Sequence, residues 1–431
     1  MPPGSITDWK PRTDIPLDRA APAELVCAGG GNAYVVFKDE NTFRDTTKRF
    51  LRAVLEKTCG MGIAVAAVET NLANFAADYK ELQRRISLTK GNVNRTLIAG
   101  SRNITQSTAQ TNEPVTRVVL RHNKYVSLSE GQYLKTKYIP KDIPKGAREF
   151  DDLTDAGNNF IGVIHADGNN MSDKIRAFVA SEIDWNSAVP KLRRMSKNIS
   201  AYFQLAYEKT VSGFDLPIIS LVTDGEDMTF IIQGKYAVSF AAEYLRNVER
   251  LNNEADIKPF DDDETITACA GVALFHSHFP FIEAYKMAEE LCSSAKSAAR
   301  RAPDTSYVDF HIHSTGFVTT VSEHRGNYYP NVGKNLYSRP LRIGGGFEDF
   351  EQLTASLSGG DKYPRTKLKS LRSALNNHAD GDFTDARALI KSLGLSDEIK
   401  PSKSAEVHEY ALLNDALEFM DTYERVAGGV A

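Results

Sequence analysis

The sequence predicts an α+β protein in which one unit, a β-hairpin followed by a helix, a strand and a second helix, occurs twice before a C-terminal helical domain. Three observations lead to this fold class. Glycine-rich or acidic turns divide two pairs of short apolar runs, at residues 25–37 and 218–232. Helical patterns follow both pairs in the same order. The roughly 85 residues after Gly346 then carry helical periodicity alone.

The first copy opens on its hairpin and ends before residue 94. After the hairpin, a helical pattern spans about residues 41–58, an apolar strand is predicted at 63–68, and a second helix at about 74–89. Only about 24 residues, rich in Pro and Asp, precede the hairpin. We therefore expect residues 1–93 to form a truncated domain that lacks its opening strand.

The second copy has an additional strand in front of its hairpin. Residues 160–167 form an apolar run that ends on an aspartate. A helical stretch then continues to about Thr210, with a break expected near Pro190. The acidic hairpin turn at residues 224–227 lies 195 residues after the glycine-rich turn at 29–32 (224 minus 29). The shared order of elements around these two turns supports an internal repeat.

The rest of the second copy keeps the order of the first. A helix is predicted at about residues 236–251, a strand at 266–274, and a further helix that Pro280 opens and that ends near residue 300. All these elements lie within residues 156–315, which we expect to fold as one domain.

Two further regions complete the chain. Residues 94–155 form a polar linker with weak strand signals around 115–120 and 125–128. Residues 316–346 are rich in Gly, Tyr, Asn and Pro and are predicted to be irregular. With the helical segments after them they form the last expected domain, residues 316–431. Its helices are predicted near residues 347–358, 364–376, 383–393 and 404–426.

Composition and charge exclude several classes of protein. With 42% hydrophobic and 25% charged residues and no apolar run of transmembrane length, the chain has the pattern of a soluble globular protein without a membrane span. The N-terminus lacks the basic and apolar regions of a signal peptide, so we expect a cytoplasmic protein. A net charge of −4 argues against a wholly electrostatic nucleic-acid binder. No two of the 4 cysteines have metal-ligand spacing, which excludes a zinc ribbon.

The strongest signal for chemistry is a set of acidic residues at one expected sheet edge. Asp167 ends a buried strand, and Asp224, Glu226 and Asp227 occupy the turn between two apolar strands. If those strands are neighbours, the carboxylates converge, and their repulsion makes the cluster costly without a bound cation. Carboxylate oxygens suit Mg²⁺ or Mn²⁺, and two such ions about 4 Å apart activate a hydroxyl and stabilise a leaving pyrophosphate. We therefore predict Asp167, Glu226 and Asp227 as catalytic residues and as ligands of two metal ions.

Other residues around this edge are predicted to bind nucleotide. Gly168 and the backbone N–H groups after it open a helix, which is a suitable seat for a triphosphate, and Gly225 permits a tight turn. Lys296 and Arg300 lie four apart on one helix face, where either can pair with phosphate oxygens. The predicted nucleotide-binding residues are Gly168, Asn169, Asn170, Gly225, Lys296, Arg300, Gly29, Gly30 and Gly31.

Each of these features also has a plainer interpretation. An acidic turn is often only a solvated turn, because Asp and Gly favour turns, and the glycines at 29–31 can form a plain hairpin turn. Lys296 can be an ordinary surface lysine. The basic clusters at residues 191–197 and 365–372 are either solvated helix faces or phosphate-contacting surfaces.

The histidines likewise admit two interpretations. His276 and His278 share a strand face, as do His311 and His313, if those segments are strands. Ordinary packing or exposure is the main expectation for both pairs, with a metal site as the alternative. His165 lies on an apolar strand and is expected to be a core histidine with satisfied hydrogen bonds.

These motifs, in this order, resemble the second palm domain of the large polymerase-like subunit of type III CRISPR complexes. The residues that carry the resemblance are Ala166-Asp167-Gly168-Asn169-Asn170-Met171, Asp224-Gly225-Glu226-Asp227, Ala270-Gly271-Val272-Ala273 and Ala295-Lys296. The resemblance implies two ferredoxin-like palms, a catalytic one at residues 156–315 and a degenerate, catalytically silent one at residues 1–93. It also implies a small helical domain at the C-terminus.

The function implied by the resemblance is that of a metal-dependent nucleotidyltransferase. Members of the family make cyclic oligoadenylate from ATP, so we expect a cyclic oligonucleotide that acts as an antiviral second messenger. The implied partners are ATP or other nucleoside triphosphates, RNA, CRISPR-type protein subunits and a second copy of the chain, with no membrane.

The sequence also departs from the family pattern. Asn169 stands where Asp is common, Asp224 and Glu226 replace Gly and Asp, and neither a histidine–aspartate nuclease domain nor a cysteine zinc cluster is found. We therefore expect a reduced or standalone relative. Two alternatives stay open: a catalytically inactive palm that acts as a scaffold or nucleotide sensor, and a dimeric dinucleotide cyclase that uses GTP.

Overall fold

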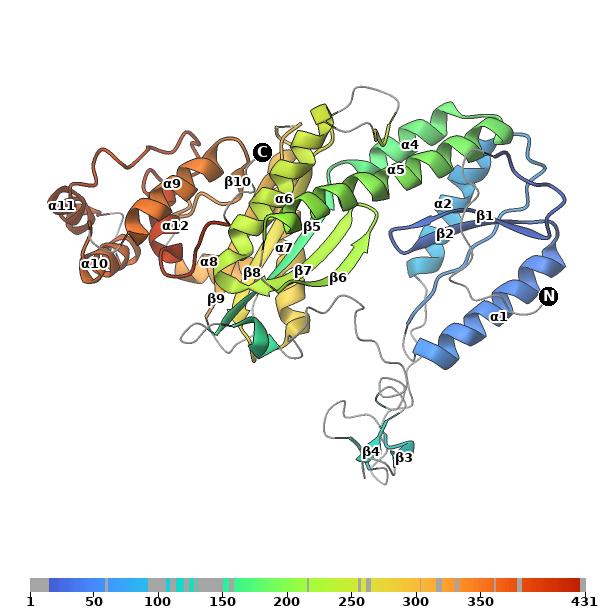
Figure 1. The fold of residues 1–431 in the computed structure, drawn as a ribbon, viewed down its shortest axis with the longest axis horizontal. Helices are drawn as coiled ribbons and strands as arrows, with labels where there is room; N and C mark the ends of the chain where they lie inside the picture. The colour runs from blue at the N-terminus through green and yellow to red at the C-terminus, as the bar shows by residue number, and fades with distance from the viewer. Residues whose placement is uncertain are drawn as a thin grey trace. The chain divides into compact units, whose positions relative to one another are not determined.

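In the computed structural model the chain divides into two compact units. The first comprises residues 1–139 and 172–197, and the second comprises residues 140–171 and 198–431. Figure 1 shows their helices and strands along the chain. The described residues are 15–58, 61–91, 106–108, 114–119, 124–127, 130, 150–154, 159–214, 217–254, 257–260, 265–302, 304–314, 320–329, 333–359, 362–377 and 382–426. The four-part division at residues 93, 155 and 315 stays a prediction.

The first unit contains the predicted hairpin and both predicted helices. Strands β1 (Ala23–Gly29) and β2 (Asn32–Phe37) pair in antiparallel fashion, and α1 (Glu40–Thr58) and α2 (Phe75–Gly91) follow. Gly30 and Gly31 have φ angles of +56° and +70°, as a two-residue hairpin turn of this kind requires.

The strand predicted at residues 63–68 is wrong. These residues carry no strand assignment, and among the described residues β1 and β2 pair only with each other. In the second copy the corresponding strand, residues 268–276, pairs with the opening strand, residues 160–168. The first copy was expected to lack such an opening strand. Residues 63–68 therefore have no neighbouring strand in the described part of the chain with which to form backbone hydrogen bonds, although their sequence suits a strand.

The helical stretch after Asp167 is interrupted earlier than predicted. Helix α4 (Met171–Ser181) and helix α5 (Trp185–Ser212) are separated at Asp184, and Pro190 lies inside α5. The Asp184 carbonyl accepts the N–H of Ala188 at 2.9 Å, so this residue starts the new helix. A proline in the second turn removes one backbone hydrogen bond, which the burial of Ala188 and Val189 offsets.

Arg193 corrects the interpretation of the basic cluster at residues 191–197. Its side chain is 1% exposed and donates to the Val26 carbonyl at 3.2 Å and to the Glu24 carboxylate at 2.8 Å. The carbonyls of Ile15 and Leu25 accept further bonds from it. This residue is therefore neither a solvated nor a phosphate-contacting side chain, since it ties α5 to β1.

A six-stranded sheet forms the centre of the second unit. Its strand order is β10-β9-β8-β5-β7-β6, with β8 and β9 parallel and the other pairs antiparallel. The strands are β5 (Phe160–Gly168), β6 (Ile219–Asp224), β7 (Asp227–Gln233), β8 (Ala268–His276), β9 (Tyr307–His313) and β10 (Leu341–Arg342). The strand that ends on Asp167 thus lies beside the acidic hairpin, as predicted.

Helices cover both faces of this sheet (Figure 1). Helix α7 (Phe281–Ala299) packs on one face, where Ile161 and Val163 of β5 share an apolar cluster with Met287 of α7. Helix α6 (Gly234–Glu254) packs on the other face, where a Cβ on Gly162 would lie 2.3 Å from the Ala237 Cβ. Alternate residues of β5 therefore face α7 and α6.

Gly271 of β8 sets how closely α7 approaches the sheet. A Cβ at this position would lie 2.1 Å from the Ala288 carbonyl oxygen and 2.3 Å from the Cys292 nitrogen. Because both clashing atoms are backbone, we expect Gly271→Ala to lower the free energy of unfolding by about 1–3 kcal/mol in urea titrations. Gly326→Ala is the control, since nothing lies within 4 Å of its added Cβ. Equal effects of the two substitutions would contradict this packing.

The region after residue 316 is more ordered than the composition indicated. Helix α8 (Val321–Tyr328) lies in the segment predicted to be irregular, and Thr320 and Glu323 form a capping box at its start. The Glu290 side chain of α7 accepts the N–H groups of Val321 and Ser322. This contact comes from a distant part of the chain, so local composition does not reveal it.

Three of the four predicted C-terminal helices are confirmed, and the fourth is shorter than predicted. The helices are α9 (Gly346–Ser358), α10 (Arg365–Asn376), α11 (Thr384–Leu393) and α12 (Ala411–Phe419). The helical pattern predicted over residues 404–426 is realised only in α12. Residues before it are drawn into other contacts, since Val407 bridges Asn335 and the His408 N–H donates to the Asn335 carbonyl.

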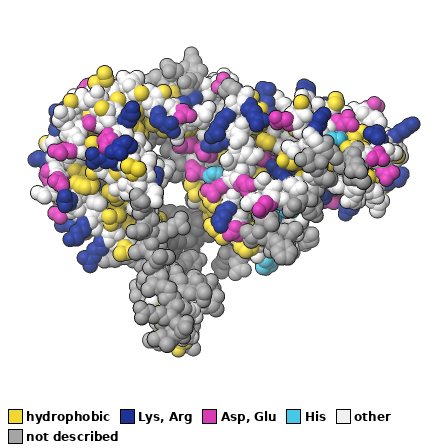
Figure 2. Space-filling model, turned by 180° about the vertical axis from the view of Figure 1, so that it is seen from behind, with side chains coloured by type: hydrophobic (Ala, Val, Ile, Leu, Met, Phe, Trp, Pro, Cys, Tyr) yellow, Lys and Arg dark blue, Asp and Glu magenta, His cyan; other side chains and the backbone are white. Residues whose placement is uncertain are grey.

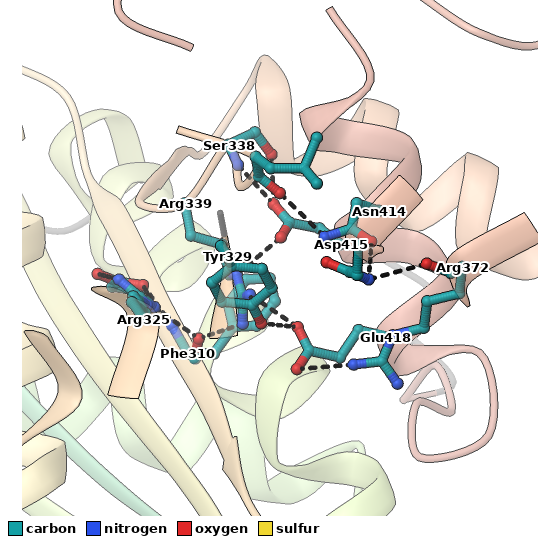
Figure 3. Close-up of polar contacts among 12 residues, drawn as sticks. Phe310, Arg325, Tyr329, Ser338, Arg339, Arg372, Asn414, Asp415 and Glu418 are labelled. Atoms are coloured by element: carbon teal, nitrogen blue, oxygen red, sulfur yellow. Dashed lines mark hydrogen bonds and ion pairs between the residues drawn. The ribbon is translucent and has the colours of Figure 1, made fainter. Parts of the chain in front are cut away.

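Buried ion pairs join β9 to α12 (Figure 3). Arg339 has no exposed side-chain surface and donates to Asp415 at 3.1 Å, to Glu418 at 2.8 Å and to the Phe310 carbonyl at 2.7 Å. Arg325 donates to the same Phe310 carbonyl at 3.0 Å. Arg339 thus bonds strand β9 and helix α12 at once, and the C-terminal helices belong to the same unit as the six-stranded sheet.

The weak strand signals between residues 94 and 155 are confirmed. Strands β3 (Arg117–Val119) and β4 (Lys124–Val126) pair where strand signals were weak. Of the helices that are described, none has both the length and the apolar character to cross a bilayer. On the face drawn in Figure 2, Lys and Arg side chains stand beside Asp and Glu side chains.

Candidate functional site

The candidate site lies where β5 ends beside the β6–β7 turn. Ala166 of β5 pairs with Met228 of β7, so one further step of the register sets Asp167 opposite Asp227. Gly225 in the turn is buried and has a φ of +65°, which favours glycine. The predicted convergence of Asp167 with this turn is thus observed.

Asp167 is held by a lysine of the neighbouring helix. Lys296 of α7 forms an ion pair with Asp167, and the two side chains are 26% and 34% exposed. The buried Ala295 and Cys292 pack this part of α7 on the sheet, which brings the lysine to the strand end. Lys296 is therefore part of the site.

Asp227 has one oxygen that is enclosed by protein. Its Oδ1 atom is buried and has no hydrogen-bond partner among the described residues, although the side chain as a whole is 44% exposed. The Nδ1 atom of His165 lies 3.5 Å from it. Burial raises the pKa of Asp227, as do the charges of Asp167 and Glu289, while His165 and Lys296 act in the opposite direction.

Glu226 leaves the turn on the opposite face from Asp227. A Cβ on Gly168 would lie 3.1 Å from the Glu226 Cβ and 2.9 Å from the Phe203 ring, on the α5 side of the sheet. Burial raises the pKa of Glu226, and the charges of Asp167 and Asp227 raise it further. The three predicted acidic residues therefore share one edge, but they approach it from two faces.

Some of the groups predicted to bind phosphate after β5 form hydrogen bonds within the protein. Gly168 pairs with Ala268 in the sheet, and the Asn169 N–H donates to the Thr267 carbonyl at 2.8 Å. The Asn169 side-chain amide donates to the Thr267 hydroxyl at 2.9 Å. Asn170 takes a left-handed φ of +57° before α4 begins. These contacts shape the turn, and nucleotide binding by it stays a prediction.

The remaining predicted nucleotide contacts are Arg300 and the glycines of the first hairpin turn. Arg300 is the C-terminal capping residue of α7, and its side chain is exposed. The Gly29–Gly31 turn belongs to the first unit, where nothing lies within 4 Å of a Cβ added to Gly30 or Gly31. Its role in binding a nucleotide stays a prediction.

The chemistry of the donors fits a divalent cation, although the described residues do not form a ready-made cage. No group of three or more His, Cys, Asp or Glu side chains within the described ranges is arranged to hold a metal ion. Asp167 and Asp227 nevertheless offer hard oxygen ligands side by side, one of them with an unpartnered buried atom. The ammonium of Lys296 already supplies one positive charge to this pair.

Sequence reasoning missed three residues around the carboxylates. His165 was expected to be an ordinary core residue, and no role was predicted for Tyr285 or Glu289 of α7. The His165 and Tyr285 rings lie 5.8 Å apart, and the charge of Glu289 acts on Asp227. Tyr285, Glu289 and Lys296 are 4 and 7 residues apart, which is the spacing of one helix face and the signal that could have found them.

The histidine pairs show no metal site in the described structure. His311 and His313 of β9 are buried, and the His311 ring lies 4.6 Å from that of His324. Burial lowers the pKa of His311, and the nearby charges of Arg325 and Arg339 lower it further, which disfavours a cation there. The His276 and His278 rings lie 5.5 Å apart at the exposed end of β8.

Glu226→Gln is expected to stabilise the fold at neutral pH. The folded-state pKa of Glu226 is raised by burial, so the wild type has its full stability below the ordinary glutamate pKa and loses some as pH rises through the folded value. Glutamine resembles the protonated form and avoids this loss. Thermal midpoints measured with a chelator present should therefore be higher for the variant at pH 7, with the difference vanishing in acid.

The exposed Glu406, whose side chain is 76% accessible, provides the control as Glu406→Gln. A lower midpoint for Glu226→Gln than for this control at pH 7 would show that the Glu226 carboxylate is stabilised by its surroundings. The expected gain would then be wrong.

Comparisons with known proteins find likenesses in the sequence of the second copy and in the fold. A family model described as "Cas10/Cmr2, second palm domain" matches residues 160–303. No curated protein matches the sequence. Among solved structures, a Csm1–Csm4 cassette in complex with cA3 has a TM-score of 0.54 and 14% identity over 93% of this chain. The cassette in complex with cA4 has a TM-score of 0.52 and 14% identity over 92% of this chain.

Csm1 in T. onnurineus is a further similar structure, with a TM-score of 0.51 and 14% identity over 93% of this chain. The chain spans 62% of the length of each of these three structures. At this identity the likeness concerns the fold, while the family match concerns the palm that carries Asp167 and Asp227. Residues 160–303 therefore match the second palm domain of Cas10/Cmr2 proteins, and the chain shares its fold with the Csm1 structures.

Proposed function

We propose that the site at the end of β5 is that of a metal-dependent nucleotidyltransferase that joins ATP into cyclic oligoadenylate, an antiviral second messenger. The observation that supports this most directly is the placement of Asp167 opposite Asp227 at one sheet edge, with Lys296 in contact with the first. The related Csm1–Csm4 structures contain cA3 or cA4, which is the product class proposed here.

In the proposed reaction, a 2′ or 3′ hydroxyl attacks the α-phosphorus of a second nucleotide. A new P–O bond forms, the bond to the bridging oxygen breaks, pyrophosphate leaves, and the hydroxyl proton passes to solvent. Bound Mg²⁺ or Mn²⁺ would supply Lewis-acid activation of the hydroxyl and charge stabilisation of the leaving group. Asp167, Asp227 and Glu226 would hold the ions, and Lys296 would bind triphosphate oxygens.

The test is pyrophosphate release by the purified full chain. Each labelled nucleoside triphosphate is supplied with Mg²⁺ or Mn²⁺, with and without candidate RNA, and the products are weighed by mass spectrometry. We expect release with ATP, and a loss of at least about 100-fold in Asp167→Asn and in the double variant Glu226→Ala/Asp227→Ala. Asp173→Asn is the control, since that side chain is 70% exposed.

Absence of release under every condition, or release unchanged in the double variant, would contradict the proposal. A product that contains guanine would favour the dinucleotide cyclase instead.

A second candidate is a nucleotide sensor or scaffold without catalysis. Two observations favour it. No three His, Cys, Asp or Glu side chains among the described residues are arranged to hold a metal ion, and the Asp167 carboxylate is already paired with the Lys296 ammonium. Calorimetry that shows ATP binding with no turnover would support it. Partners of either form would be CRISPR-type protein subunits and RNA, by analogy with the Csm1–Csm4 structures.

A further inference from the structure

His165 is a feature of the site that belongs to none of the motifs carrying the family resemblance. It lies on β5 two residues before Asp167, and its backbone pairs with Thr229 on one side and Gly271 on the other. Its side chain lies on the face that carries α7, where its ring meets the Tyr285 ring at 5.8 Å. The residue is 9% exposed.

The surroundings hold the imidazole in one place. Thr229, which is fully buried, has its hydroxyl 3.3 Å from His165 Nδ1. Tyr285 closes the α7 side, and Gly271 on the neighbouring strand lets that helix approach closely. A ring packed in this way has little freedom to turn away from the end of the strand.

The same nitrogen also faces Asp227. The Asp227 Oδ1 atom is buried and has no hydrogen-bond partner in the described part of the chain, and His165 Nδ1 lies 3.5 Å from it. Oδ1 of a carboxylate is only an acceptor, so its neighbour must donate to stabilise it. A modest closure of this distance would turn the contact into a hydrogen bond.

A carboxylate that binds a cation works best when its orientation is set beforehand. Ligand carboxylates in metal sites are commonly held by hydrogen bonds from a second layer of residues, because these limit rotation of the group. We propose that His165 is a positioning residue for Asp227, directing one oxygen inward so that the other is presented at the sheet edge. This inference rests on the proposed function.

The proposal specifies the proton and the partner. The proposal places the hydrogen on Nδ1, because Asp227 Oδ1 can only accept, whereas the Thr229 hydroxyl can accept or donate. Asparagine at position 165 can place its side-chain amide N–H near the Nδ1 location, whereas leucine fills similar space without a donor. The two variants therefore separate positioning from packing.

The experiment uses Mn²⁺ as the probe of the full chain, alone and with ATP, followed by electron paramagnetic resonance. We expect His165→Leu to weaken Mn²⁺ binding by about 10–100-fold and to broaden the signal of the bound ion. His165→Asn should remain within about threefold of the wild type, because the donor is retained. His278→Leu is the matched control, since it makes the same exchange at a histidine whose side chain is 73% exposed.

Three outcomes decide the matter. Wild-type Mn²⁺ affinity in a folded His165→Leu variant overturns the positioning role and leaves the proposed function in place. Equal losses in His165→Leu and His165→Asn, with both folded by circular dichroism, also overturn it, because the donor then has no effect. A wild-type chain that binds no Mn²⁺ with or without ATP overturns the proposed function itself, and this inference with it.

Discussion

Arg339→Met lowers the free energy of unfolding of the second unit by about 3–5 kcal/mol, the cost of removing one partner from buried ion pairs. Arg339 and Asp415 have no exposed side-chain surface, and Glu418 is 6% exposed. Methionine fills much of the same volume but leaves both carboxylates without their main counter-charge. It also removes one of the two donors to the Phe310 carbonyl, so the loss reaches β9 of the palm (Figure 3).

Urea unfolding followed by circular dichroism measures this change. Glu418 keeps Arg372 at 3.3 Å and Tyr329 at 2.6 Å, whereas Asp415 keeps only Ser338 among the described residues that donate to it. We therefore attribute most of the expected loss to Asp415.

Arg301→Met is the control for Arg339→Met, since Arg301 is 77% exposed and its partner Glu406 is 3.4 Å away. Surface pairs of this kind contribute about 0–1 kcal/mol. If the two arginine variants lose the same stability, the buried network does not hold the C-terminal helices to the sheet as described.

Lys296→Gln is expected to change metal binding and turnover in opposite directions. The ammonium of Lys296 pairs with Asp167, so a metal ion must displace it to use that carboxylate. Because both side chains are partly exposed, the pair stabilises by only about 1 kcal/mol, and the variant should bind Mn²⁺ roughly threefold to tenfold more tightly without nucleotide. Turnover should nevertheless fall by about 100-fold, since the triphosphate loses its cationic partner.

The measurement is Mn²⁺ titration without nucleotide, compared with the rate of pyrophosphate release. Lys286→Gln on the same helix is the control, because Lys286 is 59% exposed and pairs with Glu283 at 2.9 Å. Metal affinity that falls in Lys296→Gln would mean that the lysine supports the metal site instead of competing with it. Unchanged turnover would remove Lys296 from the proposed triphosphate contacts.

Much of the local structure could be predicted because it depends on neighbours in the sequence. The turn residues of both hairpins, the apolar period of α7 and the strand that ends on Asp167 are confirmed within a few residues. Residues 63–68 and 404–410 show the limit of this reasoning. Their periodicity suits a strand and a helix, but the first lacks a partner strand and the second is drawn into contacts with Asn335.

The candidate site also combines features that are local in the sequence with features that depend on tertiary contacts. The sequence by itself determined which acidic residues reach the sheet edge, because strand ends and turns are local features. Only the tertiary structure decided how they meet: Asp167 faces Asp227 across the register, Glu226 emerges on the other face, and His165 lies against Asp227. The reason is that a strand alternates its side chains with a period of two, so a single step of register, set by long-range pairing, decides which groups share a face.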